Sequence, residues 1–238
     1  MRELVAAAAS GWTGEAEIVE RYFAAHRTRA GDLRWLTAQT TKETQDFREL
    51  PPALQQEYLR TGRLAAHPQG PDAAARFAAE MRHVHLLAAL VTELSGAPLD
   101  FTTLQPLPED ATLQALRHAH RAAGGALGNA VMDFCEGGGG AMYVALSRIT
   151  GGPFEGRVAA AFAAIYRDEI GHGPMQIHRI ARVARGADDW QRAAAMVREV
   201  GAQRLLMRNE MFGHPLDAAR LAEIRAGKIE PWPLPIAI

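Results

Sequence analysis

Glutamate and histidine recur at one spacing in two stretches of the sequence that have a helical pattern. His83 follows Glu80 by three residues, and His172 follows Glu169 by three residues. Residues three apart lie on one face of an α-helix, and each pair can therefore present a carboxylate and an imidazole to the same point. Carboxylates and imidazoles are common ligands of iron and manganese. The two pairs predict a metal site.

Both pairs lie on faces that are otherwise apolar. Apolar residues recur at steps of three and four through residues 77–94 and 158–180, and Glu80 and Glu169 each occupy a position in that pattern. A buried carboxylate without a counter-charge is costly, because it loses its hydration. A bound cation would supply the counter-charge at both faces.

Two other predicted helices each place one carboxylate on an apolar face. Glu43 takes the position of an apolar residue on the first, whereas Glu49 lies off that face. On the second, Glu136 aligns with Met132 one turn away and is therefore favoured over Asp133. We expect four glutamates and two histidines to form the site.

The charge and chemistry of this set favour a pair of metal ions. Four crowded carboxylates would carry four negative charges, which two divalent cations neutralise. An oxygen-rich site with two imidazoles suits iron or manganese better than structural zinc, which prefers cysteine and histidine in tetrahedral geometry. Two iron ions are therefore expected, with manganese as the alternative.

The elements that must position these residues are helices. Apolar residues follow the helical period along most of the chain, and no long alternation of β-branched or aromatic residues indicates a sheet. The predicted fold class is all-α. The expected helices cover residues 14–30, 31–49, 51–62, 71–96, 112–149, 154–185, 187–207 and 215–226.

The connections between these helices predict a bundle with one long crossover. The turn "TGGP" at 150–153 is too short for anything but an antiparallel helix pair. Residues 97–111 can span about 50 Å when extended, which exceeds the length of roughly 39 Å expected for the helix before them. Two hairpins joined by one crossover is the connectivity of ferritin-like bundles. We expect a single domain over residues 1–238, with a metal-binding core at about 31–185.

In the order of its ligands the sequence resembles the ferritin-like di-iron carboxylate superfamily, whose pattern is Glu, ExxH, Glu, ExxH. Here the pattern reads Glu43, "EMRH" at 80–83, Glu136 and "EIGH" at 169–172. The resemblance implies a four-helix bundle with additional flanking helices. It also implies a non-haem di-iron oxidoreductase or oxygenase that activates O2 to oxidise a small organic substrate. The spacing of the last three elements is similar to that of aldehyde-deformylating oxygenases.

The resemblance also implies roles for residues beside the ligands. By analogy, Asp168 accepts the ring N–H of His83 and fixes its tautomer. Electrons would come from a separate ferredoxin or flavin reductase, because the sequence has no dinucleotide-binding motif and no cysteine cluster.

A run of glycines follows the proposed ligand Glu136. Gly137, Gly138, Gly139 and Gly140 are unfavourable inside a helix, at roughly 1 kcal/mol each relative to alanine. One interpretation is a distorted turn that, together with Tyr143, leaves room for O2 or substrate. Close helix packing, or a simple break in the helix, is an equally good interpretation.

Three other functions fit the same pattern of residues. A ferritin-type protein would store or move iron without organic chemistry. A di-manganese catalase would use the same ligands to disproportionate peroxide. A metal-free helical interaction module would hold the glutamates and histidines in ion pairs.

Composition limits the classes of partner and compartment. The 238 residues carry a formal net charge of -1, without the excess of Lys and Arg typical of nucleic-acid binders. No stretch approaches the roughly 20 apolar residues of a membrane span. The single cysteine indicates a reducing compartment, and a cytoplasmic location is expected. The tail "IEPWPLPIAI" is expected to pack over the bundle or against the second subunit of a homodimer.

Overall fold

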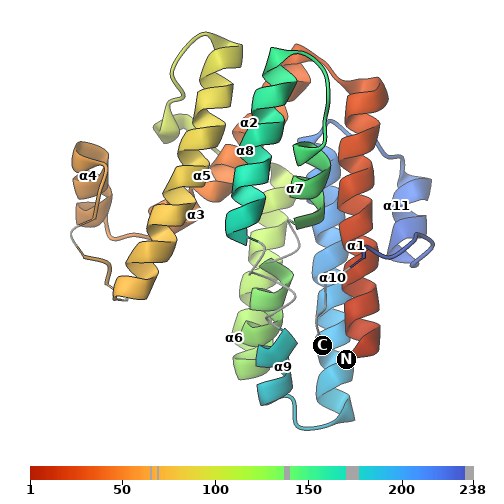
Figure 1. The fold of residues 1–238 in the computed structure, drawn as a ribbon. Helices are drawn as coiled ribbons and strands as arrows, with labels where there is room; N and C mark the ends of the chain where they lie inside the picture. Colours follow the sequence, from red (N-terminus) through yellow and green to blue (C-terminus); the bar gives the residue numbers. More distant parts are fainter. Residues whose placement is uncertain (65, 69, 137–139, 170–176, 234–238) are drawn as a thin grey trace. The chain divides into compact units, whose positions relative to one another are not determined.

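The computed structural model describes residues 1–64, 66–68, 70–136, 140–169 and 177–233, and the regular structure in these ranges is helical without a strand (Figure 1). The all-α prediction is therefore confirmed for the described chain. Whether the helices form a ferritin-like bundle stays a prediction.

The chain divides into two compact units. Unit 1 comprises Met1–Thr28 and Leu107–Ile238, whereas unit 2 comprises Arg29–Pro106. Unit 2 is thus one continuous stretch, and unit 1 is assembled from both ends of the chain. The expectation of a single domain over residues 1–238 stays a prediction.

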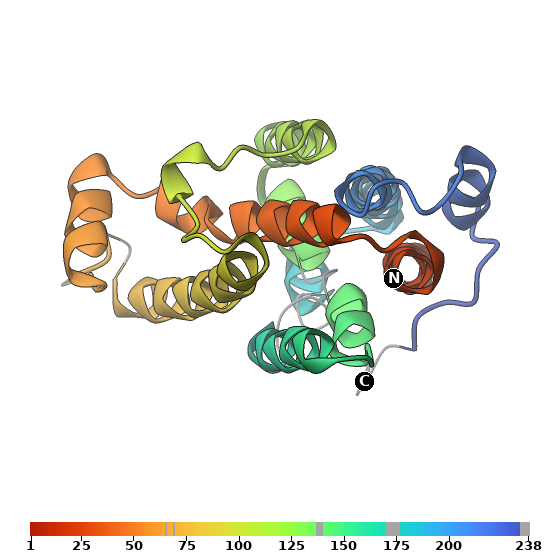
Figure 2. The same ribbon diagram turned by 90° about the horizontal axis from the view of Figure 1, so that it is seen from above.

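Unit 1 is a group of helices packed around α10. Its elements are α1 (Arg2–Arg21), a π-helical turn (Tyr22–His26), α6 (Pro108–Glu136), α7 (Gly140–Ser147), α8 (Pro153–Glu169), α9 (Ile177–Val183), α10 (Ala187–Met211) and α11 (Ala218–Arg225). The helix α10 packs against α1 and α6, and α7 packs against α1 and α8 (Figure 2). The long helix α10 therefore forms a spine for the unit.

Unit 2 is built on the pairing of α2 with α5. Its elements are α2 (Arg29–Glu43), α3 (Gln45–Arg48), α4 (Pro52–Thr61), α5 (Pro71–Ser95) and a 3-10 turn (Phe101–Thr103). The helices α2 and α5 pack along each other (Figure 2). At one end, Leu50, Phe77, Met81 and Val84 form a buried apolar cluster. This packing fixes the faces of α2 and α5 that carry the proposed ligands.

Helix boundaries depart from the sequence prediction in several places, and the expected helix 31–49, for example, is seen as α2 and α3. The first helix begins at Arg2, whereas the expectation was residue 14, because the alanine-rich start of the chain is itself a good helix former. The expected helix 112–149 is interrupted at Gly125, whose φ of 55° and ψ of -134° are not helical. The expected helix 154–185 is seen as α8 and α9, and residues 170–176 between them lie outside the described residues.

A buried ionic cluster joins α1 to α10 within unit 1. Glu15 accepts hydrogen bonds from Arg204 Nε at 3.0 Å and from Arg208 Nε at 3.1 Å, and Arg204 Nη1 donates to the carbonyl of Cys135 at 3.0 Å. Burial alone would raise the pKa of Glu15, but the two guanidinium groups outweigh that effect and hold the pKa below its ordinary value of 4.5. The carboxylate is therefore stabilised in its charged form.

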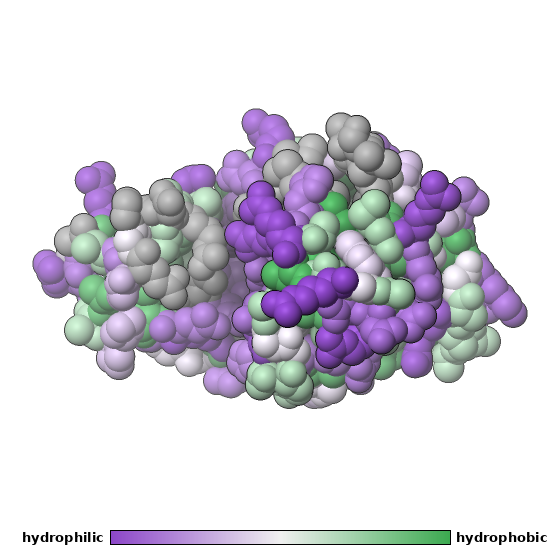
Figure 3. Space-filling model, turned by 90° about the horizontal axis from the view of Figure 1, so that it is seen from below, coloured by the Kyte–Doolittle hydropathy of each residue, from purple (hydrophilic) through white to green (hydrophobic). Residues whose placement is uncertain are grey.

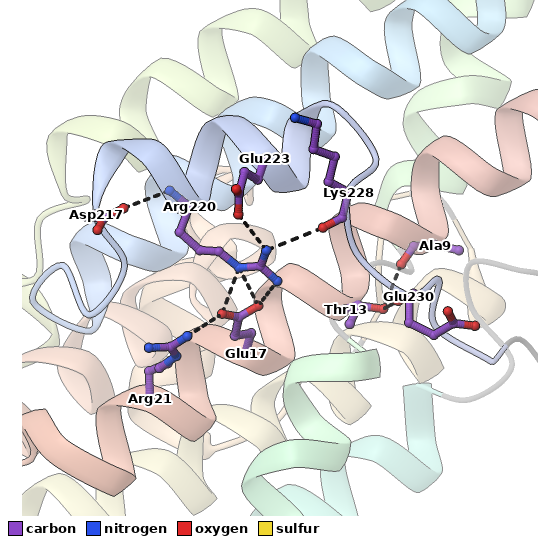
Figure 4. Close-up of polar contacts among 9 residues, drawn as sticks. All are labelled: Ala9, Thr13, Glu17, Arg21, Asp217, Arg220, Glu223, Lys228 and Glu230. Atoms are coloured by element: carbon purple, nitrogen blue, oxygen red, sulfur yellow. Dashed lines mark hydrogen bonds and ion pairs between the residues drawn. The ribbon is translucent and has the colours of Figure 1, made fainter.

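The C-terminal segment is held against α1 by polar contacts (Figure 4). Arg220 of α11 donates from Nη2 to Glu17 Oε2 at 2.8 Å. Further along, Thr13 Oγ1 donates to the carbonyl of Glu230 at 2.8 Å. The backbone N–H of Trp232 donates to a backbone carbonyl of α1 at 3.1 Å. The described part of the predicted tail thus packs on its own chain.

Hydrophilic and hydrophobic residues are mixed on the face of the protein that is drawn in Figure 3. Among the described residues the exposed large hydrophobic side chains are Met1, Leu59 and Leu86, which are far apart in the sequence. In the same part of the chain, no helix has the length and apolar character needed to cross a membrane.

Two glycines of α1 differ in the space around them, which gives a matched test of packing. A Cβ added at Gly14 would lie 2.7 Å from Leu205 Cδ2 and 2.8 Å from Ile224 Cγ2, whereas a Cβ at Gly11 would meet nothing within 4 Å. Relative to Gly11→Ala, we expect Gly14→Ala to lower the free energy of unfolding by about 1–3 kcal/mol, because the core is overpacked. Urea unfolding measures both variants, and equal stabilities would contradict close packing at Gly14.

Candidate metal centre

Two helices of unit 2 bring together three of the predicted ligands. Glu43 is the last residue of α2, and Glu80 and His83 lie on one face of α5. On α2, the buried residues Leu36 and Gln39 precede Glu43 on the inward side of the helix. On α5 the buried positions follow steps of three and four, as the sequence pattern indicates. The packing of α2 against α5 therefore directs these side chains toward each other.

The three side chains form a cluster that could hold one ion. His83 Nδ1 lies 3.5 Å from Glu80 Oε2 and 3.8 Å from Glu43 Oε2, and one potential ligand atom from each residue lies within 4.8 Å of the others. Hydrogen bonds are usually about 2.7–3.2 Å long, so both distances are longer. Atoms that bind one transition-metal ion at about 2.0–2.2 Å lie roughly 3–3.5 Å apart. The cluster is therefore close to the spacing of ligands around a shared ion.

Burial and charge in the cluster favour a cation. The His83 side chain is 1% exposed, that of Glu43 10% and that of Glu80 19%. Burial alone would lower the pKa of His83, but the facing carboxylates of Glu43 and Glu80 outweigh burial and raise the pKa to about 10. The surroundings thus stabilise a positive charge at Nδ1. A metal ion bound there can supply this charge in place of the proton.

The carboxylate of Glu43 is likewise held in its charged form. Burial would raise its pKa, but His83 and Lys42 attract the negative charge, and Gln39 donates a hydrogen bond to it. Together these groups hold the pKa of Glu43 below its ordinary value of 4.5. Metal ligands must be deprotonated, so this effect prepares Glu43 for a cation.

Gln39 is a residue of the centre that the sequence analysis missed. Its side chain is buried, with the residue 1% exposed, and its Nε2 donates a hydrogen bond to Glu43 Oε1. Gln39 precedes Glu43 by four residues, which places the two on one face of α2. That spacing was the available signal, but a glutamine one turn from a glutamate is also common on solvent-exposed helices.

The other three predicted ligands belong to unit 1. Glu136 is the last residue of α6, and its side chain lies outside the described part of the structure. Glu169 is the last residue of α8 and is half-buried. His172 lies outside the described residues. Their convergence with the cluster in unit 2 stays a prediction.

The alternatives to two of the predicted ligands have other contacts. Asp133 forms ion pairs with Arg121 at 3.1 Å and with Arg179 at 2.7 Å. Glu49 is exposed and accepts a hydrogen bond from Gln45 at 3.0 Å. The preferences for Glu136 over Asp133 and for Glu43 over Glu49 stay predictions.

The predicted roles of the remaining residues, those beside the metal ligands, stay predictions. Asp168 is exposed near the end of α8, and its predicted contact with the histidine of the other unit stays a prediction. Gly137, Gly138 and Gly139 lie outside the described residues, whereas Gly140 begins α7. Tyr143 is buried on α7, with its ring centroid 5.8 Å from that of Phe162. The predicted substrate pocket therefore stays a prediction.

The helical architecture and the Glu–Glu–His cluster can be compared with known proteins. No family model, no curated protein and no solved structure matches the chain. The interpretation of the centre therefore depends on its own residues and on the geometry that α2 and α5 give them.

Proposed function

We propose that this protein binds iron at Glu43, Glu80 and His83 and is a non-haem di-iron oxidoreductase of the ferritin-like kind. The observation that supports the proposal is the cluster of two partly buried carboxylates that face the buried imidazole of His83 at 3.5 and 3.8 Å. Carboxylates and imidazoles are both ligands suited to iron. The two distances between the carboxylate oxygens and the imidazole nitrogen exceed those of ordinary hydrogen bonds. We assign the second ion to Glu136, Glu169 and His172 from the order of motifs in the sequence.

The proposed reaction is the O2-dependent oxidation of a small organic substrate. Bound iron would supply the electron transfer to O2, with electrons replenished by a ferredoxin or a flavin reductase. The task of Glu43 and Glu80 is to supply negative charge that balances the cation. The nearly complete burial of His83 keeps water away from its ring. A shielded site of this kind limits side reactions with solvent.

Iron loading tests the proposal against its rivals. The full chain, stripped of metal and loaded with Fe(II) without oxygen, is expected to retain two iron ions per chain by elemental analysis. Exposure to O2 should then change the absorption spectrum. In Glu169→Ala the count should fall below two, because a ligand from unit 1 is lost. Wild-type protein that retains no iron would contradict the proposal and favour a metal-free ion-pair network.

Two further assays on the same protein distinguish the other metal-dependent functions. A ferritin-type protein would accumulate iron far beyond two ions per chain during aerobic loading. A di-manganese catalase would disproportionate hydrogen peroxide after loading with Mn(II), which oxygen release measures. The oxidoreductase is expected to retain two iron ions per chain and to consume O2. It should neither accumulate further iron nor disproportionate peroxide.

A further inference from the structure

We infer that Gln39 is a positioning residue that determines which carboxylate oxygen of Glu43 binds the metal. Gln39 Nε2 donates to Glu43 Oε1, while Glu43 Oε2 is the oxygen that lies 3.8 Å from His83 Nδ1. The two oxygens of Glu43 thus have different partners. This inference rests on the proposed metal centre.

The direction of the hydrogen bond follows from its partners. An ionised carboxylate only accepts hydrogen bonds, so the amide must present its NH2 group and not its carbonyl to Glu43. A carboxylate that binds a metal ion is ionised. The orientation of the amide is therefore fixed by chemistry.

The burial of Gln39 makes this hydrogen bond persistent. The residue is 1% exposed, so water has little access to compete for the amide. Breaking the bond would leave a buried polar group without compensation, which is unfavourable. The carboxylate plane of Glu43 is consequently held with Oε2 toward the cluster.

A neutral donor is suited to this position. A lysine or arginine would also bind Oε1, but its positive charge would repel the cation and neutralise the ligand. An amide orients the carboxylate and leaves its charge for the metal. Glu43 is then expected to bind through Oε2 alone, because Oε1 is engaged by Gln39. Hydrogen-bond partners of this kind commonly change metal affinity about 10–100-fold.

The control for this inference is a second glutamine–glutamate pair in unit 2. Gln45 Nε2 donates to Glu49 Oε1 at 3.0 Å with the same separation of four residues. Both residues of this control pair belong to an exposed contact and neither is part of the metal cluster. Replacing Gln45 therefore removes an equivalent hydrogen bond without changing the ligands.

Cobalt(II) binding to the full chain tests the inference. Methionine is close to glutamine in shape but lacks the amide. In Gln39→Met we expect Co(II) affinity to fall about 10–100-fold. We also expect its visible d–d bands to change in intensity, because Glu43 can turn both oxygens toward the ion. Gln45→Met should match the wild type in affinity and spectrum. Circular dichroism checks that both variants fold. If Gln39→Met does not fold, Gln39→Asn takes its place, because the shorter asparagine side chain cannot bring its amide to Glu43 Oε1.

The outcomes separate this inference from the proposed function. If the wild type binds Co(II) and the Gln39 variant binds it with the same affinity and spectrum, the positioning role is overturned and the metal centre stays intact. Wild-type protein that binds no Co(II) would overturn both. A weaker affinity with an unchanged spectrum would also overturn the positioning role, because it would show that the coordination of Glu43 is not altered.

Discussion

In His83→Ala, metal affinity at the cluster is expected to fall by about 100-fold or more, because the change removes the nitrogen that both carboxylates face. Loss of a partner that merely orients a ligand already costs about 10–100-fold, and loss of a ligand should cost at least as much. Titration of metal-stripped protein with Co(II) or Fe(II) measures the affinity. Helicity should be largely retained, because α5 is also held by the apolar contacts of Phe77, Met81 and Val84.

A neighbouring histidine provides the control for this prediction. His85 lies two residues further along α5 and is exposed, so it is directed away from the buried cluster. His85→Ala should therefore bind metal as the wild type does. Full retention of metal by the His83 variant would remove His83 from the site, whereas an equal loss in both variants would indicate nonspecific binding by surface histidines.

The largest effect on stability is expected in Glu15→Gln. This change leaves the buried guanidinium groups of Arg204 and Arg208 without the charge that compensates them, and such losses typically cost 3–5 kcal/mol. Chemical denaturation followed by circular dichroism measures the loss. Glu3→Gln is the control, because Glu3 pairs with Arg198 at 2.6 Å on the surface, where an ion pair is worth at most about 1 kcal/mol.

The same cluster predicts a dependence of stability on pH. The pKa of Glu15 lies below its ordinary value of 4.5 in the folded state, so the unfolded chain takes up this proton more readily. The contribution of Glu15 is thus fully present above about pH 4.5 and is lost as the pH falls through the lower pKa of the folded state. Glu15→Gln should show a smaller loss of stability than the wild type over that acidic range. Parallel pH profiles for the two proteins would contradict the assignment.

Much of the helical structure could be predicted because local signals specify it. The helix expected at 71–96 is observed as α5, Pro71–Ser95, with Gly96 in the left-handed conformation directly after it. The helix expected at 51–62 is α4, Pro52–Thr61, and Gly62 terminates it in the same way. Proline at the start and glycine after the end are strong boundary signals. The break at Gly125 was not predicted, because a glycine inside a helical pattern is often tolerated.

Three of the predicted site residues lie together where burial and spacing pointed in the same direction, and their role as metal ligands stays a prediction. Glu80 and His83 share a face at a fixed step, and Glu43 replaces an apolar residue, so their approach in unit 2 could be inferred from the pattern. The pairing of Glu15 with Arg204 could not, because 189 positions separate them and no local period relates their helices. Contacts of that kind become visible only when the topology is known.

The division of the chain into a continuous unit and a discontinuous one has a consequence for the order of events during synthesis. Every residue of unit 2 has been translated before α6 begins, whereas α1 waits for α10 and α11 near the end of the chain. Domains generally fold as units while the ribosome is still elongating the polypeptide. The helices that carry Glu43, Glu80 and His83 can therefore pair early. The helix α1, in contrast, meets α7 only after unit 2 and α6 have been made, and it meets α10 and α11 later still. Until then its apolar face is a surface that nascent-chain chaperones would have to shield.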